Sequence, residues 1–173
     1  MKRILTSAIC IAMAVFFLAA CATADSREKR DAAVTVLTAM RNFDSETYSA
    51  NVELNESMRA DEIFMNDAGE QFEELMEAIF SQVSWNLGTA RINDDGRGSI
   101  TATIRAIDVG ALIVVASEEV QVEYEFYDLI IEKISNRDFE WTNTEVEIIF
   151  EKIGDEWKVV VNEELVAAFA GNL

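Results

Sequence analysis

Among the side chains that act as nucleophiles, proton carriers or metal ligands, this sequence is rich in carboxylates and poor in histidine and cysteine. The chain of 173 residues has no histidine, two cysteines (Cys10 and Cys21) and 32 acidic residues. Without histidine, the Ser-His-Asp and Cys-His nucleophilic schemes and the commonest zinc ligand are excluded. Among so many carboxylates, neighbouring pairs arise by chance. We therefore assign no catalytic residue, no metal ligand and no cofactor.

Cys21 is the residue whose surroundings indicate a specific chemistry. The chain opens with two basic residues, residues 4–20 carry no charge, and small side chains come directly before Cys21. A positive start, an apolar stretch and small residues before a cleavage point are typical of a secretory signal peptide. The sequence therefore predicts that residues 1–20 are a signal peptide and that the exported chain begins at Cys21.

The four residues Leu18, Ala19, Ala20 and Cys21 resemble the lipobox of bacterial lipoproteins. That resemblance implies that the Cys21 thiol receives a diacylglyceryl group and that the signal is removed after Ala20. Two or more acyl chains suffice for stable anchoring, because each buried CH₂ contributes about 0.8 kcal/mol. We expect a lipid-anchored protein on the outer face of the cytoplasmic membrane, or on the outer membrane of a cell with two membranes. The alternatives are a plain signal peptide and an uncleaved anchor.

Composition limits the partners of the exported chain. Its 153 residues suit one domain with a core, which we place at 28–173 after a short lipidated tether at 21–27. Loss of the two basic signal residues leaves 12 basic and 32 acidic residues, a net charge of −20. This charge repels phosphate backbones, so we exclude nucleic acid as a partner. The same charge should repel the membrane surface, so that the body of the domain stays away from the bilayer in which its lipid is anchored.

Helices and strands are predicted from the spacing of apolar residues. A helix is expected over 25–42, where Asp25 and Glu28 resemble a capping box, and another over 70–83. Period-two alternation predicts strands at 85–92, 99–107, 145–151 and 157–161, joined in pairs by turns at 93–98 and 152–156. Asn162 should cap a last helix over 163–170, which Gly171 stops.

The segment 108–136 fits two periods. Alternation around Val120–Phe126 indicates a strand, and local propensity favours that structure there. A helical stripe of apolar residues nevertheless continues from Leu112 to Ile134 over six turns, with no turn signal between 111 and 134. We expect mostly helix, with a strand through 120–126 as the alternative.

Two passages, residues 32–52 and 142–173, resemble uncharacterised bacterial lipoproteins of the nuclear transport factor 2-like superfamily. The sharpest shared motif is the late hairpin with Lys152, Gly154, Asp155, Trp157, Lys158 and Val159. The resemblance implies an α+β fold in which N-terminal helices pack on the concave face of a curved antiparallel sheet, forming a cone. It also implies that 108–136 is a helical insertion. In many members of the superfamily the cone is a pocket.

Large aromatic residues are the candidates for lining such a pocket. We select Trp85, Phe126 and Phe80, although sheet core is the commoner role for a tryptophan. Trp157 should lie in the core on the same face as Val159 and Val161, and Trp141 should be partly exposed. Enzymes of the superfamily use Asp and Tyr inside the cone. Tyr124, Tyr127 and Asp128 could imitate them, but nothing in the sequence fixes their geometry.

The leading functional hypothesis is therefore non-catalytic binding of a small apolar ligand or a protein partner at the cell envelope. The main alternative is an interaction module whose cone is filled by its own side chains, and an enzyme using buried carboxylates is a remote one. An apolar cavity above about 300 Å³ in the cone would favour a ligand. A filled cone with an exposed apolar patch would favour an interaction module.

Substitution of the lipid-bearing cysteine tests the anchor. We expect Cys21→Ser to release the protein from membranes or to block removal of the signal, because the thioether is the proposed attachment. Membrane fractionation and mass spectrometry of the mature N-terminus check this. A free thiol at Cys21, or a chain that still begins at Met1, would contradict it.

Overall fold

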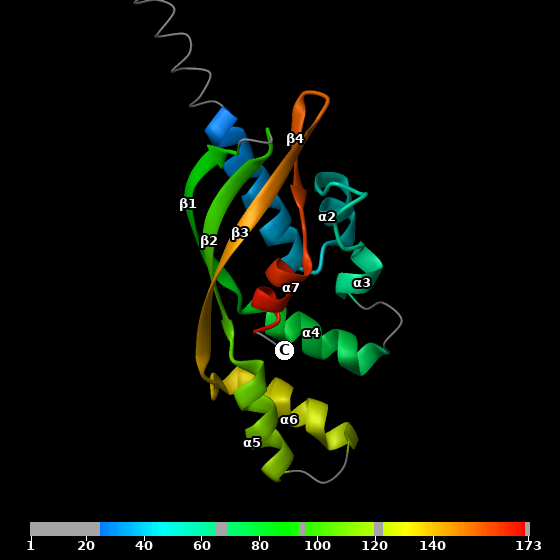
Figure 1. The fold of residues 1–173 in the computed structure, drawn as a ribbon. Coiled ribbons are helices and arrows are strands. Elements are labelled where there is room, and N and C mark those ends of the chain that lie inside the picture. Colours follow the sequence, from blue (N-terminus) through cyan, green and yellow to red (C-terminus); the bar gives the residue numbers. More distant parts are fainter. Residues whose placement is uncertain (1–24, 65–68, 94–95, 120–122, 172–173) are drawn as a thin grey trace, which may run out of the picture.

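Four strands form one antiparallel sheet in the order β1-β2-β3-β4 (Figure 1). They are β1 (Ser84–Ile92), β2 (Gly98–Ile107), β3 (Trp141–Ile153) and β4 (Glu156–Val160). The structure is a computed structural model, and it describes residues 25–64, 69–93, 96–119 and 123–171. The predicted α+β class with an antiparallel sheet is confirmed. The predicted signal peptide and Cys21 lie outside the described residues.

Helices cover one face of this sheet and extend beyond one of its ends. They are the N-terminal helix (residues 25–41), α2 (Ser45–Asn51), α3 (Ala60–Phe64), α4 (Glu70–Ser81), α5 (Val109–Glu119), α6 (Glu123–Asn136) and α7 (Glu163–Phe169). Figure 1 shows the N-terminal helix, α2, α4 and α7 on the same side of the sheet. It shows α5 and α6 as a pair beyond the end of the sheet opposite the two hairpin turns. We call the hairpin end proximal and the α5–α6 end distal.

The alternation of apolar and polar side chains along the strands shows which face of the sheet is buried. Along β2 the buried residues are Ile100, Ala102, Ile104 and Ala106, and the exposed ones are Thr101, Thr103 and Arg105. The register pairs Ala102 with Val146 and Ile100 with Ile148, so the buried rows of β2 and β3 lie side by side. Since neighbouring side chains of a strand point to opposite faces, one face belongs to the core and the other is open.

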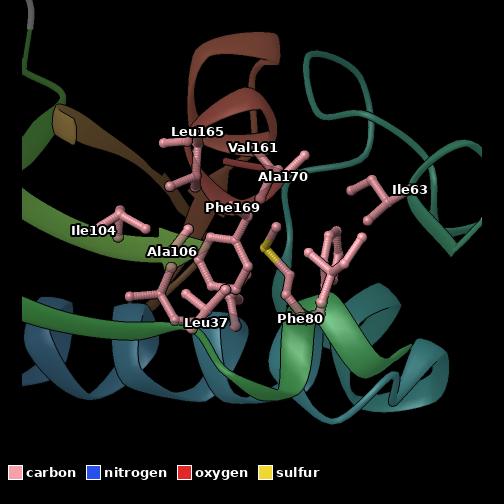
Figure 2. Packing of buried hydrophobic residues seen from close by; sticks show 14 of the residues in the cluster. Leu37, Ile63, Phe80, Ile104, Ala106, Val161, Leu165, Phe169 and Ala170 are labelled. Atoms are coloured by element: carbon pink, nitrogen blue, oxygen red, sulfur yellow. The ribbon is translucent and has the colours of Figure 1, made fainter. Parts of the chain in front are cut away.

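Aromatic rings fill the space between the sheet and its helices. Phe80 of α4 and Phe169 of α7 are fully buried, and their ring centroids lie 5.7 Å apart. The ring centroids of Phe43 and Phe80 lie 5.5 Å apart, and Trp85 of β1 stacks on Phe169 with a centroid distance of 6.3 Å. Figure 2 shows Phe169 and Phe80 among the aliphatic side chains of the same cluster. These separations are within the range of directly contacting rings.

The segment between the hairpins consists of two helices, so the expected single stripe over six turns is wrong. Helices α5 and α6 pack against each other, and α6 also packs against α4. Residues 123–126 are helical, which excludes that part of the alternative strand, and residues 120–122 lie outside the described chain. The helical prediction for 108–136 is otherwise confirmed. Periodicity missed the break because both helices have apolar faces in similar phase.

The last helix ends as its sequence predicts. The Asn162 side chain accepts a hydrogen bond from the backbone N–H of Leu165 at 3.0 Å, which caps the first turn of α7. Gly171 follows with φ +70°, and a Cβ at that position would overlap the carbonyl oxygen of Ile107. Glycine is therefore required at this position both by its backbone conformation and by close contact with the end of β2.

Trp157 joins the N-terminal helix to the sheet. It lies on the predicted face, with Val159, but it is half-buried at the proximal edge of the core. Its indole Nε1 donates to the Asp25 carboxylate at 2.7 Å, and the Lys29 ammonium lies 4.0 Å from the ring centroid. Lys29 is almost fully buried and also donates to Asp25. Asp25 therefore binds these two side chains, and the predicted capping box is not seen.

The charge state of Asp25 follows from the same contacts. Burial alone would raise the pKa of this carboxyl. The hydrogen bonds from Lys29 and Trp157, with the positive charges of Lys29 and Lys152, outweigh burial and hold the pKa below its ordinary value. Asp25 is therefore ionised at neutral pH and can hold both partners.

A matched pair of leucines tests whether α7 closes the core. Leu165 is fully buried on α7, whereas Leu54 is the most exposed large apolar residue of the described chain. We expect Leu165→Ala to lower the free energy of unfolding by about 2–5 kcal/mol, because it leaves a cavity. Leu54→Ala should change it by less than about 0.5 kcal/mol. Denaturant unfolding of both variants measures the difference, and equal losses would show that α7 is not part of the core.

Candidate functional site

The residues predicted to line a pocket do not form one lining. Phe80 and Trp85 both contact Phe169 inside the core. Phe126 lies on α6, where its ring meets Tyr127 at 5.9 Å. The Tyr127 ring in turn meets Phe72 of α4 at 6.3 Å, so this aromatic pair belongs to the contact between the two helices. Phe80 and Trp85 stabilise the core, and Phe126 belongs to the helix pair.

The polar residues weighed for catalysis do not converge either. Tyr127 is partly buried against α4, while Asp128 beside it is exposed. The side chain of Tyr124 is not among those that the structure describes. Among the described residues, no three Asp, Glu, His or Cys side chains lie close enough together to hold a metal ion.

A hollow of about 220 Å³ lies beside Tyr48, but the loop that surrounds it uses its own polar groups. The Tyr48 hydroxyl donates to the carbonyl oxygen of Met58 at 2.7 Å, and burial followed by the charge of Glu62 raises its pKa. The buried Glu53 carboxylate accepts hydrogen bonds from Asn55 and from backbone amides of the loop, which lower its pKa. These groups hold the loop together, so they offer little to a ligand.

A groove at the distal end has a different character. We call it the distal groove: it has a volume of about 310 Å³ and is lined by Ala111, Leu112, Val115, Arg137, Asp138, Phe139 and Glu140. One wall is the first half of α5, and the other is the segment that connects α6 to β3. Backbone hydrogen bonding fixes the two walls together, because the Asp108 amide donates to the Glu140 carbonyl at 2.8 Å. The Asp108 carboxylate then caps α5 by accepting from the Ala111 amide at 2.9 Å.

Apolar side chains are exposed on and beside this groove. Val115 is 45% exposed, and its neighbour Val114 on α5 is 58% exposed. On the opposite wall the rings of Phe139 and Trp141 meet edge to face, with centroids 4.9 Å apart. Trp141 is partly exposed, as predicted. A contiguous exposed apolar patch with a polar rim is typical of an interaction surface.

Two arginines lie beside these apolar residues without acidic partners. The Arg105 guanidinium lies 4.2 Å from the centroid of the Trp141 ring, and Arg137 lines the distal groove. Neither makes an ion pair with any carboxylate of the described residues. Lys133, one helical turn before Arg137, is instead paired with Glu119 at 2.9 Å and Asp138 at 3.6 Å. In so acidic a protein, two exposed guanidinium groups thus remain available for other carboxylates.

Arg137 also has an unfavourable backbone conformation. The Arg137 amide bonds to the Ile134 carbonyl and the Asp138 amide to the Lys133 carbonyl, which together form a Schellman motif. Arg137 occupies the position that usually holds glycine, with φ +57°. Phe43 has a similar angle of +56°, but its ring packs in the core. The Arg137 side chain is exposed, so its left-handed backbone conformation makes it a candidate functional residue.

The sequence held only part of the signal for this groove. Residues 111–116 are six consecutive apolar residues, and a helix that packs on one side cannot bury all of them. That argument could have predicted exposed valines on α5. Arg137 could not have been found this way, because its selection depends on its backbone angle and on the lack of an ion pair with the described carboxylates.

Comparison with family models, with curated proteins and with solved structures finds no match. The site must therefore be interpreted from its own geometry. None of the helices described here is long and apolar enough to cross a membrane.

Replacing Arg137 with glycine separates its role from the stability of the fold. We expect Arg137→Gly to raise the free energy of unfolding by about 1 kcal/mol, because it relieves the left-handed backbone conformation of an L-residue. Arg137→Ala, which keeps the strain, is the control and should not stabilise. Thermal or denaturant unfolding measures both, and a loss of stability in the glycine variant would contradict the account of strain.

Proposed function

We propose that this protein is a lipid-anchored, non-catalytic interaction module of the bacterial envelope that binds a protein partner in the distal groove. The observation that carries the proposal is the adjacency of exposed Val115 and Trp141 to two arginines that lack acidic partners. The open antiparallel sheet with helices on one face is consistent with a nuclear transport factor 2-like scaffold, which forms part of the same proposal.

The groove favours a partner of particular chemistry. Its apolar surface suits one or two aliphatic or aromatic side chains, and tryptophan and arginine are the residues most enriched among binding hot spots. A guanidinium binds a carboxylate through two parallel hydrogen bonds, and its planar face can remain stacked on an aromatic ring while it does so. We therefore infer that the partner presents an apolar segment that carries an acidic side chain or a C-terminal carboxylate.

The filled core supports a protein partner over a small apolar ligand. The space in which a cone pocket would lie contains the contacting rings of Phe43, Phe80 and Phe169. Opening it would cost the stability that these buried aromatic residues provide. The distal groove, at about 310 Å³, is at the lower limit for a drug-sized ligand and lies open at the surface. A protein segment can use the groove together with the exposed residues around it.

Lipid attachment would present the groove to such a partner. The N-terminal helix begins at the hairpin end of the sheet, and the distal groove lies at the opposite end (Figure 1). An anchor at Cys21, only a few residues before the helix, would leave the groove facing away from the bilayer. This arrangement suits recognition of another envelope component.

Photo-crosslinking from the groove tests the proposal. A photoreactive residue at Val115 should form a discrete adduct with one partner in intact cells. The same residue at Leu54, which is exposed outside the groove, should not form it. Arg137→Gly and Trp141→Ala should each weaken binding of the purified partner about fivefold to thirtyfold, which corresponds to about 1–2 kcal/mol. Identical adducts from both positions, or unchanged affinity in both variants, would contradict the proposal.

A further inference from the structure

The proximal end of the molecule combines the start of the N-terminal helix with both hairpin turns. Ile92 pairs with Gly98, and Gly98 pairs with Phe150, so the first hairpin closes in the same row as Phe150 on β3. Ile153 lies three residues further along β3, beyond that row. Figure 1 shows the start of the N-terminal helix beside these turns.

Each of the two hairpins has an exposed isoleucine at this end. Ile92 is 63% exposed and Ile153 is 48% exposed. Single exposed apolar residues are common on protein surfaces. Two of them lie on separate hairpins at the end where the N-terminal helix begins. Contact with the interfacial region of a bilayer would remove both side chains from water.

The charge of the protein is very unevenly distributed. By sequence, residues 25–31, 91–97 and 151–158 contain seven basic and eight acidic residues. Glu53 and Glu56 also lie at this end, because the Glu53 amide bonds to Val159 and Glu56 pairs with Arg97, so the net charge here is −3. Residues 60–81 and 118–132 contain thirteen acidic residues and no basic ones. Because charges are screened over about 8 Å at physiological ionic strength, the acidic helices repel a membrane only where they approach it. The less acidic proximal end can therefore approach headgroups that the acidic helices avoid.

The N-terminal helix holds this end close to the membrane. Residues 21–25 span at most about 14 Å, even when fully extended. The helix cannot pivot away from the hairpins, because Asp25 is bonded to Trp157 and the buried Lys29 side chain lies over the same ring. Gly98 makes room for this arrangement, since a Cβ there would overlap the Lys29 side chain.

We propose that the proximal end is a membrane-contact surface, with Ile92 and Ile153 entering the interfacial region of the bilayer. The inference rests on the lipid anchoring proposed above, because the anchor keeps this end within reach of the bilayer. Two isoleucines give weak binding by themselves, but attachment at Cys21 raises their effective concentration at the surface. The contact fixes the orientation in which the distal groove is presented.

A depth-sensitive fluorophore on the reconstituted lipoprotein tests this contact. The mature chain has no cysteine other than the lipidated one, so Glu156→Cys places one label on the second hairpin and leaves both isoleucines intact. Glu132→Cys, on the acidic helix α6, is the matched control. In phosphatidylcholine vesicles, lipids brominated near the headgroup should quench the label at residue 156 at least twofold more than the label at residue 132.

The isoleucines can then be removed without disturbing the core. Ile92→Ser with Ile153→Ser should abolish the extra quenching at residue 156 while the unfolding midpoint stays unchanged, because both side chains are exposed. Equal quenching at the two labels, or quenching that survives the double substitution, would overturn the proposal. Failure of the protein to float with the vesicles would overturn the anchoring and this inference with it. Crosslinking at Val115 reports separately on the distal groove.

Discussion

The packing of aromatic rings between the sheet and its helices is the constraint on which the rest of the structure depends. Phe169 of α7 contacts both Phe80 and Trp85, so the last helix of the chain closes the core that earlier elements begin. The residues that the structure describes include no cysteine, so this part of the chain depends on such packing for its stability. The aromatic residues of the interior stabilise the fold, and we therefore propose that recognition takes place at the surface.

The surface is divided along the long direction of the molecule. At one end Asp25, Lys29 and Trp157 fasten the N-terminal helix to the sheet, next to hairpins of nearly balanced charge. At the other end α5 and the segment before β3 hold apolar side chains and Arg137 around a groove, and Arg105 of β2 lies against the nearby Trp141 ring. The thirteen acidic residues in the sequence ranges 60–81 and 118–132 discourage nonspecific association. This division underlies the two proposals, a bilayer contact at one end and a protein partner at the other.

Local patterns predicted the parts of the fold that local forces determine. Alternation located the four strands and the buried faces of β2 and β3, and Asn162 and Gly171 marked the limits of α7. The division of 108–136 into two helices could not be predicted, because it depends on α6 packing against α4 and α5. The local pattern predicted a helix cap at Asp25. It could not predict the hydrogen bond to Trp157, because that residue lies 132 positions away in sequence. For the groove, partial exposure of Trp141 was predicted, whereas the choice of Arg137 depends on a backbone angle that only the folded chain defines.

The central claim is that the protein acts through its distal surface and not through an interior pocket. The most direct measurement is the rate at which a membrane-impermeant maleimide labels the Val115→Cys variant. The rate is measured on whole cells in which the reagent reaches the protein, and again on the purified protein. Leu54→Cys serves as the reference for general accessibility. The account predicts that labelling at residue 115 is several-fold slower in cells, where the partner covers the groove, while labelling at residue 54 is unchanged. Equal rates at residue 115 in the two settings would contradict it.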